Sequence, residues 1–259
     1  MDLRKDQPGG IDDGPELPQS VDIVVPVFNE DVDLETKITQ LRRFLKEKFP
    51  YRWTIRIVDN GSTDRTPEIG RALAARWPGE VEYLHLEEKG KGRAIRAGWT
   101  AGRAGFLCFM DLDLSTDLSA LNPLIEPLVG GRCDLAVGSR LLPGSRVRRS
   151  RKRDALSRLY NRLLRMHFPR ARFSDAQCGF KAATRAAAEE LLPGVRDNAW
   201  FFDTELLLQA RRKGFRIEEV PIQWTEDPGT KVRLPSTAGM LLKGLWRVRL
   251  SKPRRGGPR

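Results

Sequence analysis

The sequence predicts an α/β fold, a mostly parallel β-sheet covered by helices on both faces. Two observations predict this class. Short runs rich in β-branched and apolar residues alternate along the chain with longer amphipathic stretches, and the short runs are nearly continuous in apolar residues, as in strands buried on both faces. With 259 residues, the chain is long enough to bury a sizeable core.

The alternation of predicted elements begins at about residue 21. Each strand is assigned from an apolar, β-branched run and each helix from an amphipathic stretch of ten or more residues. In chain order we expect strand 21–27, helix 33–49, strand 54–58, helix 66–77, strand 81–86, helix 91–102, strand 106–110, helix 119–130 and strand 135–137.

The predicted domain organisation is simple. Residues 1–19 combine several prolines and glycines with few apolar groups, which is typical of a flexible leader. We expect residues 20–250 to form one domain, with a first half at 20–140 and a second half at 141–250, followed by a basic tail at 251–259.

The positive charge of the chain is concentrated in one region. The formal net charge is +12, which points to an anionic partner. Between residues 140 and 172 there are twelve Lys or Arg and one acid, a local net charge of +11. Nearly all of the excess charge therefore belongs to this short segment.

Two stretches in the second half read as basic amphipathic helices, residues 155–168 and 240–250. Their apolar residues interleave with Arg and Lys, a pattern that suits a helix lying at a membrane interface. The same pattern suits an ordinary helix with a core-facing stripe and a solvated basic face, because periodicity cannot distinguish burial in protein from burial in lipid.

Several classes of protein are excluded or disfavoured. Cys108, Cys133 and Cys178 are scattered and form no CxxC pair, which argues against a disulfide framework. His85 and His167 are too few and too far apart for a histidine-based zinc site. The sequence shows neither a signal peptide nor an apolar run of about 18 residues that could cross a bilayer. We therefore expect a cytoplasmic protein.

Acidic residues follow three of the predicted strands. Glu30 follows the first strand, Asp59 ends the second, and Asp111 and Asp113 follow the strand at 106–110. In a parallel sheet these strand ends meet at one edge, where ligands of such folds bind. Aspartates at turns are common, but three acidic strand ends suggest an oxygen-only site for Mg²⁺ or Mn²⁺ that bridges to nucleotide phosphates.

The motifs resemble a known family. VPVFNE, VDNGSTDRT, EKGKGRAIRAGW, FMDLDLS and VGSR resemble the nucleotide-sugar domain of family 2 glycosyltransferases, which implies the Rossmann-like GT-A fold. The later motifs DAQCGFK, WFFDTELL, EVPIQWTE and GTKV resemble the dolichyl-phosphate β-glucosyltransferase branch of the polyprenyl-phosphate hexosyltransferases. The likeness spans roughly residues 21–250.

The resemblance implies a donor side. Pro26, Phe28 and Glu30 would line the pocket for the base and ribose, and Asp59 would accept a hydrogen bond from the base. Asp113 would be the direct metal ligand.

Two further residues belong to this donor side. Asp111 would contact the ribose, or the metal through water, and Lys91 would help to hold the diphosphate.

The resemblance also implies an acceptor side. Arg140 would reach phosphate at the end of its strand, and Arg153 with Ser157, four residues apart on one helical face, would grip the phosphate of a lipid acceptor. Further acceptor-side or sugar-side residues implied by the motifs are Asp175, Gln177, Lys181, Asp203, Glu205 and Lys231. For Glu205 a structural role, as a cap or as partner of a buried Arg, is equally compatible with the sequence.

The implied function is an inverting, metal-dependent transfer of a hexose, glucose in the first place, from a UDP-sugar or, as a second choice, a GDP-sugar to polyprenyl phosphate. The acceptor phosphate is already ionised at neutral pH and needs no strong base. If Asp175 or Glu205 acted as a base, the acceptor would instead be a hydroxyl.

The partners follow from this function. Besides the two substrates, we expect peripheral contact with the anionic inner face of the membrane, and such an arrangement would allow a separate membrane protein as a further partner. The alternative is a soluble family 2 glycosyltransferase acting on a hydroxyl of a small metabolite or glycan. Nucleic acid is not an expected partner, because the basic residues lie on Leu-rich helical faces and in no nucleic-acid-binding motif.

Overall fold

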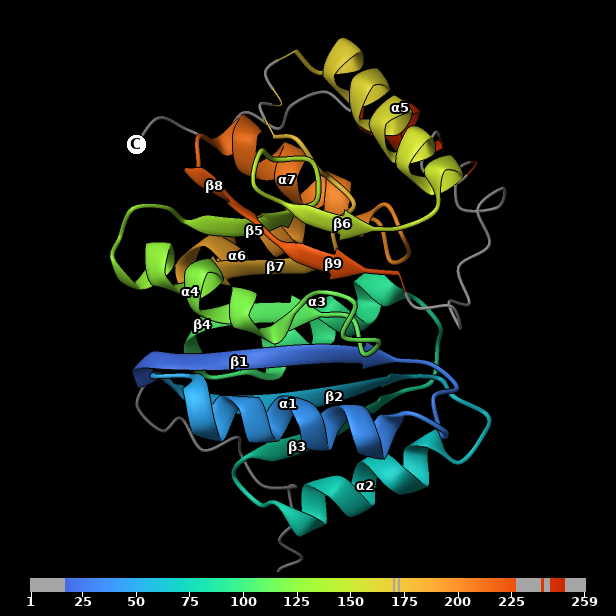
Figure 1. Cartoon of the computed structure of the whole chain (residues 1–259), viewed down its shortest axis with the longest axis vertical. Coiled ribbons are helices and arrows are strands. Elements are labelled where there is room, and N and C mark those ends of the chain that lie inside the picture. The colour runs from blue at the N-terminus through green and yellow to red at the C-terminus, as the bar shows by residue number, and fades with distance from the viewer. Residues whose placement is uncertain (1–16, 170, 172, 227–238, 240–242, 250–259) are drawn as a thin grey trace, which may run out of the picture.

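A seven-stranded mixed sheet forms the centre of the computed structural model, which describes residues 17–169, 171, 173–226, 239 and 243–249 (Figure 1). The strand order is β3-β2-β1-β4-β7-β5-β8. The strands are β1 (Leu17–Val27), β2 (Arg52–Asn60), β3 (Val81–Leu86), β4 (Ala104–Met110), β5 (Leu135–Ser139), β7 (Phe180–Thr184) and β8 (Ile217–Pro221).

The helices follow the predicted alternation, and short 3₁₀ turns precede α4 and follow α6. The helices are α1 (Leu34–Lys48), α2 (Thr66–Arg76), α3 (Lys91–Ala101), α4 (Leu121–Val129), α5 (Arg151–His167), α6 (Arg185–Leu191) and α7 (Phe202–Lys213). The prediction of an α/β fold with a mostly parallel sheet is confirmed.

One strand runs against the others. β7 pairs antiparallel with both β4 and β5, whereas β1, β2, β3 and β4 form a parallel set and β5 pairs parallel with β8. The sequence prediction had no strand here. The five residues of β7 include two alanines in a row and only one β-branched residue, Thr184, so the segment shows little of the pattern by which strands are recognised from sequence.

Alternate residues of the central strands enter two separate cores. Ile23 and Val25 of β1 pack with α1 and α4 on one face, and Val24 packs with α3 on the other face. Helices α6 and α7 complete the second core. The apolar runs are therefore continuous because both faces of the sheet are covered, as Figure 1 shows.

The start of the first strand differs from the prediction. β1 begins at Leu17, which pairs with Ala104, rather than at Val21. The pairing is irregular between these two residues of β1, where Pro18 lacks the N–H that a regular ladder needs. The proline and glycine content of the preceding segment made the strand look shorter. Residues 1–16 and 251–259 lie outside the described residues.

Helix α5 differs from the other helices in how little of it is buried. Only Asn161 and Leu164 are buried, whereas the side chains of Leu156, Leu159 and Met166 are exposed. The helix begins at Arg151, four residues earlier than predicted. It lies at the outside of the molecule, as Figure 1 shows.

Of the second predicted amphipathic helix, residues 243–249 are described, and these are helical, as is residue 239 just before the predicted start. In this segment Leu245 and Val248 are buried in the core of the α3 face, and Trp246 is exposed. In the part of the chain that the structure describes, no helix has both the length and the apolar character needed to cross a membrane.

The structure also contains a second, two-stranded sheet. It consists of β6 (Arg146–Arg148) and β9 (Gln223–Thr225), which pair in parallel. Trp224 of β9 also forms a bridge with Thr116, in the loop after β4. This small sheet therefore connects the chain before α5 with the loop at the end of a central strand.

Candidate active site

The carboxyl ends of three parallel strands meet at one edge of the main sheet. Val27 at the end of β1 is paired with Asp59 in β2, and Val24 of β1 is paired with Phe109 of β4, two residues before Asp111. The strand ends that carry the predicted acids are therefore neighbours. Ligands of open α/β sheets bind at such an edge.

The loops after β1 and β2 are fastened to each other. Asn29, whose φ of 54° is in the left-handed region, accepts a hydrogen bond on its side chain from Thr63 N–H, and its own N–H donates to Ser62 Oγ. The N–H of Glu30 donates to Thr66 Oγ1. The backbone around Glu30 is thus held by the loop that starts α2.

Two other predicted pocket residues lie close to this loop. Pro26 is half-buried near the end of β1. The ring of Phe28 is also half-buried, and the ammonium of Lys89 lies 3.7 Å from its centroid. A cation over the ring face is a favourable contact, so Phe28 is covered on one side by the loop before α3.

Asp59 is fully buried, contrary to the expectation that it would present an oxygen to the base. Its carboxylate accepts hydrogen bonds from Ser62 N–H and Tyr83 O–H, and His85 Nδ1 lies 2.8 Å from Oδ2. Burial alone would raise the pKa of Asp59, but these hydrogen bonds outweigh burial and lower it. Because Asp59 and His85 are register neighbours on β2 and β3, the carboxylate is used inside the protein.

Asp111 and Lys91, both predicted to lie on the donor side, form an ion pair. Lys91 Nζ lies 2.6 Å from Asp111 Oδ1, with side chains 12% and 43% exposed respectively. Burial by itself would lower the pKa of Lys91, but the carboxylates of Asp111 and Asp203 outweigh it and raise the pKa. Lys91 is therefore a fully charged ammonium at this edge, as its predicted role requires.

Glycines allow these charged groups to approach. Gly90, just before α3, has a φ of 156°, and a Cβ there would collide with the carbonyl of Asn198. A Cβ on Gly179 would collide with the carboxylate of Asp111. The Gly-Lys-Gly turn and the Cys-Gly-Phe segment are therefore fixed by close backbone packing.

Asp113 lies in a tight turn after β4. Its Oδ1 accepts a hydrogen bond from Ser115 N–H at 2.9 Å, and the intervening Leu114 has a φ of 53°. Burial, and next the negative charge of Asp111, raise the pKa of Asp113. The turn thus holds two carboxylates close enough to repel each other.

These two carboxylates fit a divalent cation as an incomplete set of ligands. Among the described residues no cluster of three or more acidic, His or Cys side chains could hold a metal. Mg²⁺ is commonly held by one or two carboxylates, with waters and substrate phosphates completing its shell. A cation would relieve the repulsion between Asp111 and Asp113. The pair therefore fits Mg²⁺ or Mn²⁺, for which a bound diphosphate would supply further oxygen ligands.

Arg140 is held by Asp175 in a two-point ion pair. Arg140 Nε lies 2.7 Å from Asp175 Oδ2 and Nη2 lies 2.9 Å from Oδ1, and the Arg140 N–H also donates to this carboxylate. Asp175 is fully buried; burial would raise its pKa, but Arg140 outweighs it and lowers the pKa. The structure does not support Asp175 as a base, because its oxygens already serve Arg140.

Lys181 is inaccessible, contrary to the expectation that it binds substrate. It is 1% exposed, its Nζ lies 2.5 Å from Asp203 Oδ1, and it also donates to the carbonyl of Cys178. Lys181 is the second residue of β7 and is paired with Phe109 of β4 and Val137 of β5. Its ammonium is therefore the internal counter-ion of Asp203 on α7.

Gln177 connects two helices. Its Nε2 donates to Thr204 Oγ1 at 2.6 Å, and the hydroxyl of Tyr160 on α5 lies 2.8 Å from the same oxygen. The Asp175–Lys181 motif thus supports the position of α5 against α7. No contact in the described residues gives Gln177 a direct catalytic role.

Glu205 has the structural role that the sequence left open. Its Oε2 accepts hydrogen bonds from the N–H groups of Arg196 and Asp197 and from Arg247 Nη2, at 3.0, 2.7 and 2.8 Å. The side chain is almost fully buried. Glu205 therefore fixes the loop before α7 and the helical segment 243–249, and the prediction that it is catalytic is not supported.

The predicted acceptor-phosphate pair lies at the start of α5. Arg153 Nε is 2.8 Å from Glu226 Oε1, and the Arg153 side chain is 24% exposed. One turn later, the hydroxyl of Ser157 is buried and has no hydrogen-bond partner among the described residues. Lys231, the last predicted substrate-binding residue, lies outside the described residues.

Sequence reasoning missed the residues that hold the predicted ones. Tyr83 and His85 orient Asp59, and Glu226 holds Arg153. Asn60 accepts a hydrogen bond from Gly90 N–H at 2.6 Å and so joins β2 to the start of α3. Asn60 and Glu226 lie inside motifs that carry the family resemblance, so these motifs could have pointed to both residues.

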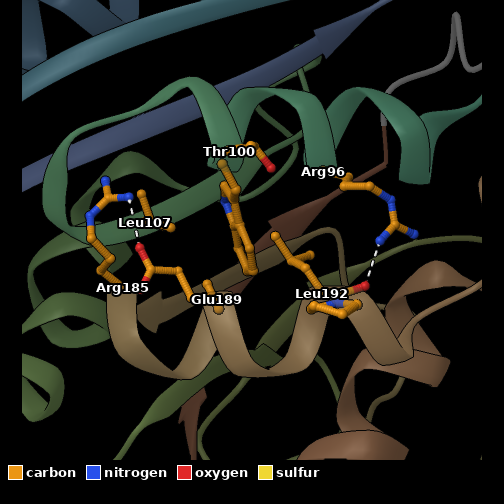
Figure 2. Close-up of a pocket in the computed structure, with 9 residues that line it drawn as sticks. Arg96, Thr100, Leu107, Arg185, Glu189 and Leu192 are labelled. Atoms are coloured by element: carbon orange, nitrogen blue, oxygen red, sulfur yellow. Dashed lines mark hydrogen bonds and ion pairs between the residues drawn. The ribbon is translucent and has the colours of Figure 1, made fainter. Parts of the chain in front are cut away.

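A separate pocket of about 400 Å³ lies between α3 and α6 (Figure 2). Arg96 and Thr100 line it from α3, Arg185 and Glu189 from α6, and Leu107 from β4. Because α3 starts at the strand-end site and runs away from it, Thr100 lies about 13 Å further along the helix axis than Lys91. None of the predicted site residues lines this pocket.

Comparison with known proteins agrees with this architecture. The family model described as Glycosyl transferase family 2 matches residues 22–192. A protein of Haloferax volcanii named Glycosyltransferase AglD is 38% identical over 216 residues, which cover 83% of this chain and 34% of that relative. The chain thus spans about a third of the length of AglD.

A second relative is matched over more of its length. The dolichyl-phosphate beta-glucosyltransferase of Saccharomyces cerevisiae is 31% identical over 247 residues, covering 88% of this chain and 74% of the relative. Among solved structures, glucosyl-3-phosphoglycerate synthase from Mycobacterium tuberculosis, in complex with UDP, superposes with a TM-score of 0.67 at 20% identity, over 89% of this chain and 80% of that one. This likeness shows a shared fold.

Proposed function

The chain belongs to glycosyl transferase family 2, and on that premise we propose that it transfers glucose from UDP-glucose to a polyprenyl phosphate at a membrane surface. The relative from S. cerevisiae, matched over most of both chains, carries the name dolichyl-phosphate beta-glucosyltransferase. The observation that carries the proposal is the position of Arg153, a partly exposed arginine at the start of a basic helix with an exposed apolar face.

On the donor side, the carboxylates and Lys91 have complementary tasks. Asp113, together with Asp111, would hold a divalent ion, which when bound supplies Lewis-acid stabilisation of the diphosphate. The ammonium of Lys91, 2.6 Å from Asp111, would neutralise negative charge on the departing nucleoside diphosphate. Pro26 and Phe28, near the carboxyl end of β1, would border the base and ribose.

On the acceptor side, Arg153 would bind the phosphate of the acceptor. Arg153 Nε is taken by Glu226, and the two terminal Nη groups would bind the phosphate oxygens of the acceptor. Ser157, whose hydroxyl has no partner among the described residues, would donate a further hydrogen bond. Arg140 is held by Asp175 and would contribute mainly positive charge near the site.

The chemistry needs no general base. A phosphate monoester is largely ionised at neutral pH, since its second pKa is about 6, so its oxygen can attack the anomeric carbon directly. The bond from that carbon to the phosphate oxygen forms as the bond to the nucleoside diphosphate breaks, and the diphosphate leaves with the electron pair. One displacement inverts the centre and gives a β-linked product. The engagement of Asp175 and Glu205 in internal contacts is consistent with this.

The surface of α5 suits a membrane. Leu159 and Met166 are 54% and 67% exposed on α5, and Trp246 is 61% exposed on the neighbouring helical segment. Arg162 and Arg165 of α5 are also exposed. Apolar side chains among arginines are typical of a helix that lies in the interface of an anionic bilayer. We place this face on the cytoplasmic side of the membrane.

One experiment tests the function. The protein is incubated with a panel of UDP- and GDP-sugars, Mg²⁺ or Mn²⁺, and either polyprenyl phosphate in vesicles or a series of water-soluble alcohols. We expect transfer of glucose from UDP-glucose to the lipid. Transfer to an alcohol with none to polyprenyl phosphate would overturn the proposal in favour of a hydroxyl acceptor.

A further inference from the structure

Glu226 makes a two-sided contact at the start of α5. Its Oε1 lies 2.8 Å from Arg153 Nε, and its Oε2 accepts a hydrogen bond from Ser150 N–H at 2.8 Å. The side chains of Glu226 and Arg153 are 20% and 24% exposed. Both carboxylate oxygens are thus in use, one on the arginine and one on the residue before the helix, so Glu226 fixes the helix start and the arginine together.

The ion pair with Glu226 involves only the Nε atom of the Arg153 guanidinium. The structure gives the terminal Nη groups of Arg153 no hydrogen bond to the described residues. An ion pair at Nε restrains the guanidinium and leaves its two terminal amino groups for two-point binding of a phosphate. The hydroxyl of Ser157, which is buried and has no hydrogen-bond partner in the part of the chain that the structure describes, lies one turn further along the same helix.

The segment that carries Glu226 is bound to the donor-side loop. Thr225 N–H donates to the carbonyl of Ser115, and Asp117 N–H donates to the carbonyl of Gln223, both at 2.9 Å. The N–H of Ser115 in turn donates to Asp113 Oδ1. Two hydrogen bonds therefore link Asp113 to Ser115 and Ser115 to Thr225. Thr225 directly precedes Glu226, the residue that pairs with Arg153.

We infer that Glu226 is a positioning residue for the acceptor: it aims the free edge of Arg153 at the acceptor phosphate and sets the distance of that arginine from the loop of Asp113. This inference rests on the proposed function, in which Arg153 binds the phosphate of a polyprenyl phosphate. Alignment of a nucleophile with its target is a large part of catalysis in such a displacement.

Electrostatics alone predicts the opposite effect of losing this carboxylate, which makes the inference sharp. Removing the negative charge of Glu226 raises the local positive charge, so a purely electrostatic role would strengthen the binding of an anionic acceptor and lower its KM. A positioning role predicts weaker acceptor use, because Arg153 is no longer held in one orientation.

The test compares Glu226→Gln with the wild-type enzyme and with Asp154→Asn. Asp154 also binds arginines at the start of α5, namely Arg149 and Arg158, but Arg153 forms its ion pair with Glu226 and not with Asp154, so Asp154 is a matched control. We expect Glu226→Gln to raise the KM for polyprenyl phosphate about tenfold, which corresponds to the loss of one charged hydrogen bond between Arg153 and the acceptor phosphate. The Kd for UDP, measured by calorimetry, should stay unchanged. Asp154→Asn should leave both values unchanged.

The outcomes separate the inference from the function on which it rests. A KM for Glu226→Gln that is unchanged or lower, in a wild type that glycosylates polyprenyl phosphate, overturns the positioning role alone. A wild type that transfers nothing to polyprenyl phosphate overturns the proposed function; calorimetry with inorganic phosphate then decides on Glu226, since weaker binding by Glu226→Gln supports its control of Arg153 and equal binding contradicts it. Glu226→Asp, which keeps the charge, should restore part of the KM if Glu226→Gln folds poorly.

Discussion

Lys91 Nζ and Asp111 Oδ1 are 2.6 Å apart, so the amino end of α3 and the turn after β4 are joined by an ion pair at the edge where the strands end. Both side chains are proposed to act on the donor, and in this structure they form an ion pair with each other. An ammonium and a metal ion would compete for the negative charge of the same carboxylate. On the proposed donor side, the pair would therefore couple metal binding to the position of Lys91.

Replacing Lys91 by Met should strengthen metal binding in the absence of nucleotide. Without the ammonium, the carboxylates of Asp111 and Asp113 lose a counter-charge, and the affinity for Mn²⁺ should rise about fivefold to tenfold, a modest effect because Asp111 is partly exposed to water. Calorimetric titration with Mn²⁺ measures this. Lys46→Met, which removes a surface partner of Glu80, is the control; an unchanged Mn²⁺ affinity in Lys91→Met would contradict the coupling.

Replacing Asp113 by Asn should remove metal-dependent donor binding. Asp113 is held by Ser115 N–H, and Asn can keep that hydrogen bond while losing the negative charge that a cation needs. We expect UDP binding to become independent of Mn²⁺ and transfer to fall by about two orders of magnitude. Binding of UDP with and without Mn²⁺ is measured by calorimetry; full metal dependence in the variant would rule Asp113 out as a ligand.

Replacing Arg153 by Met should weaken acceptor use and leave the donor alone. Loss of the guanidinium removes its hydrogen bonds to the phosphate, so the KM for polyprenyl phosphate should rise tenfold or more. Arg158→Met removes the same charge from the same helix, but Arg158 is 64% exposed and paired with Asp154, so it should change the KM little. A loss of UDP affinity in Arg153→Met would show that Arg153 acts on the donor side.

Breaking the Lys181–Asp203 pair should destabilise the protein, since both side chains are almost fully buried. Lys181→Met leaves the carboxylate without its partner, and we expect the free energy of unfolding to fall by about 3–5 kcal/mol. Urea denaturation measures this. The double variant Lys181→Met with Asp203→Leu removes both charges and should recover much of the loss. Full stability in Lys181→Met alone would contradict an internal role.

Acidic residues on the exposed face of α5 should prevent membrane binding. Leu159→Glu together with Met166→Glu places charge where apolar side chains would enter the lipid, and binding to vesicles containing anionic lipid should fall at least tenfold. Sedimentation with vesicles measures it. Val32→Glu is the control, because Val32 is 85% exposed in the loop before α1 and does not belong to α5. Equal binding by the double variant and the wild type would exclude α5 as the membrane contact.

The fold was largely predictable from local pattern. The strands from β1 to β5, and the helices α1 to α4 between them, follow from apolar runs and amphipathic stretches, since both faces of the sheet are covered. The antiparallel strand β7 was missed, because its alanines pack well only between β4 and β5. Its place in the sheet is a property of its neighbours rather than of its own residues.

The candidate site was predictable in its residues but not in their roles. Sequence alone determined that acids follow three strands, that Lys91 lies between glycines and that arginines crowd the start of α5. Only the tertiary structure decided which of the predicted charged residues have their partners inside the protein. Asp175 pairs with Arg140, Lys181 pairs with Asp203, and Glu205 binds the loop before α7. The physical reason is that a charge's role depends on its burial and its nearest partner, and here those partners are 35, 22 and 8 or more residues away in the chain.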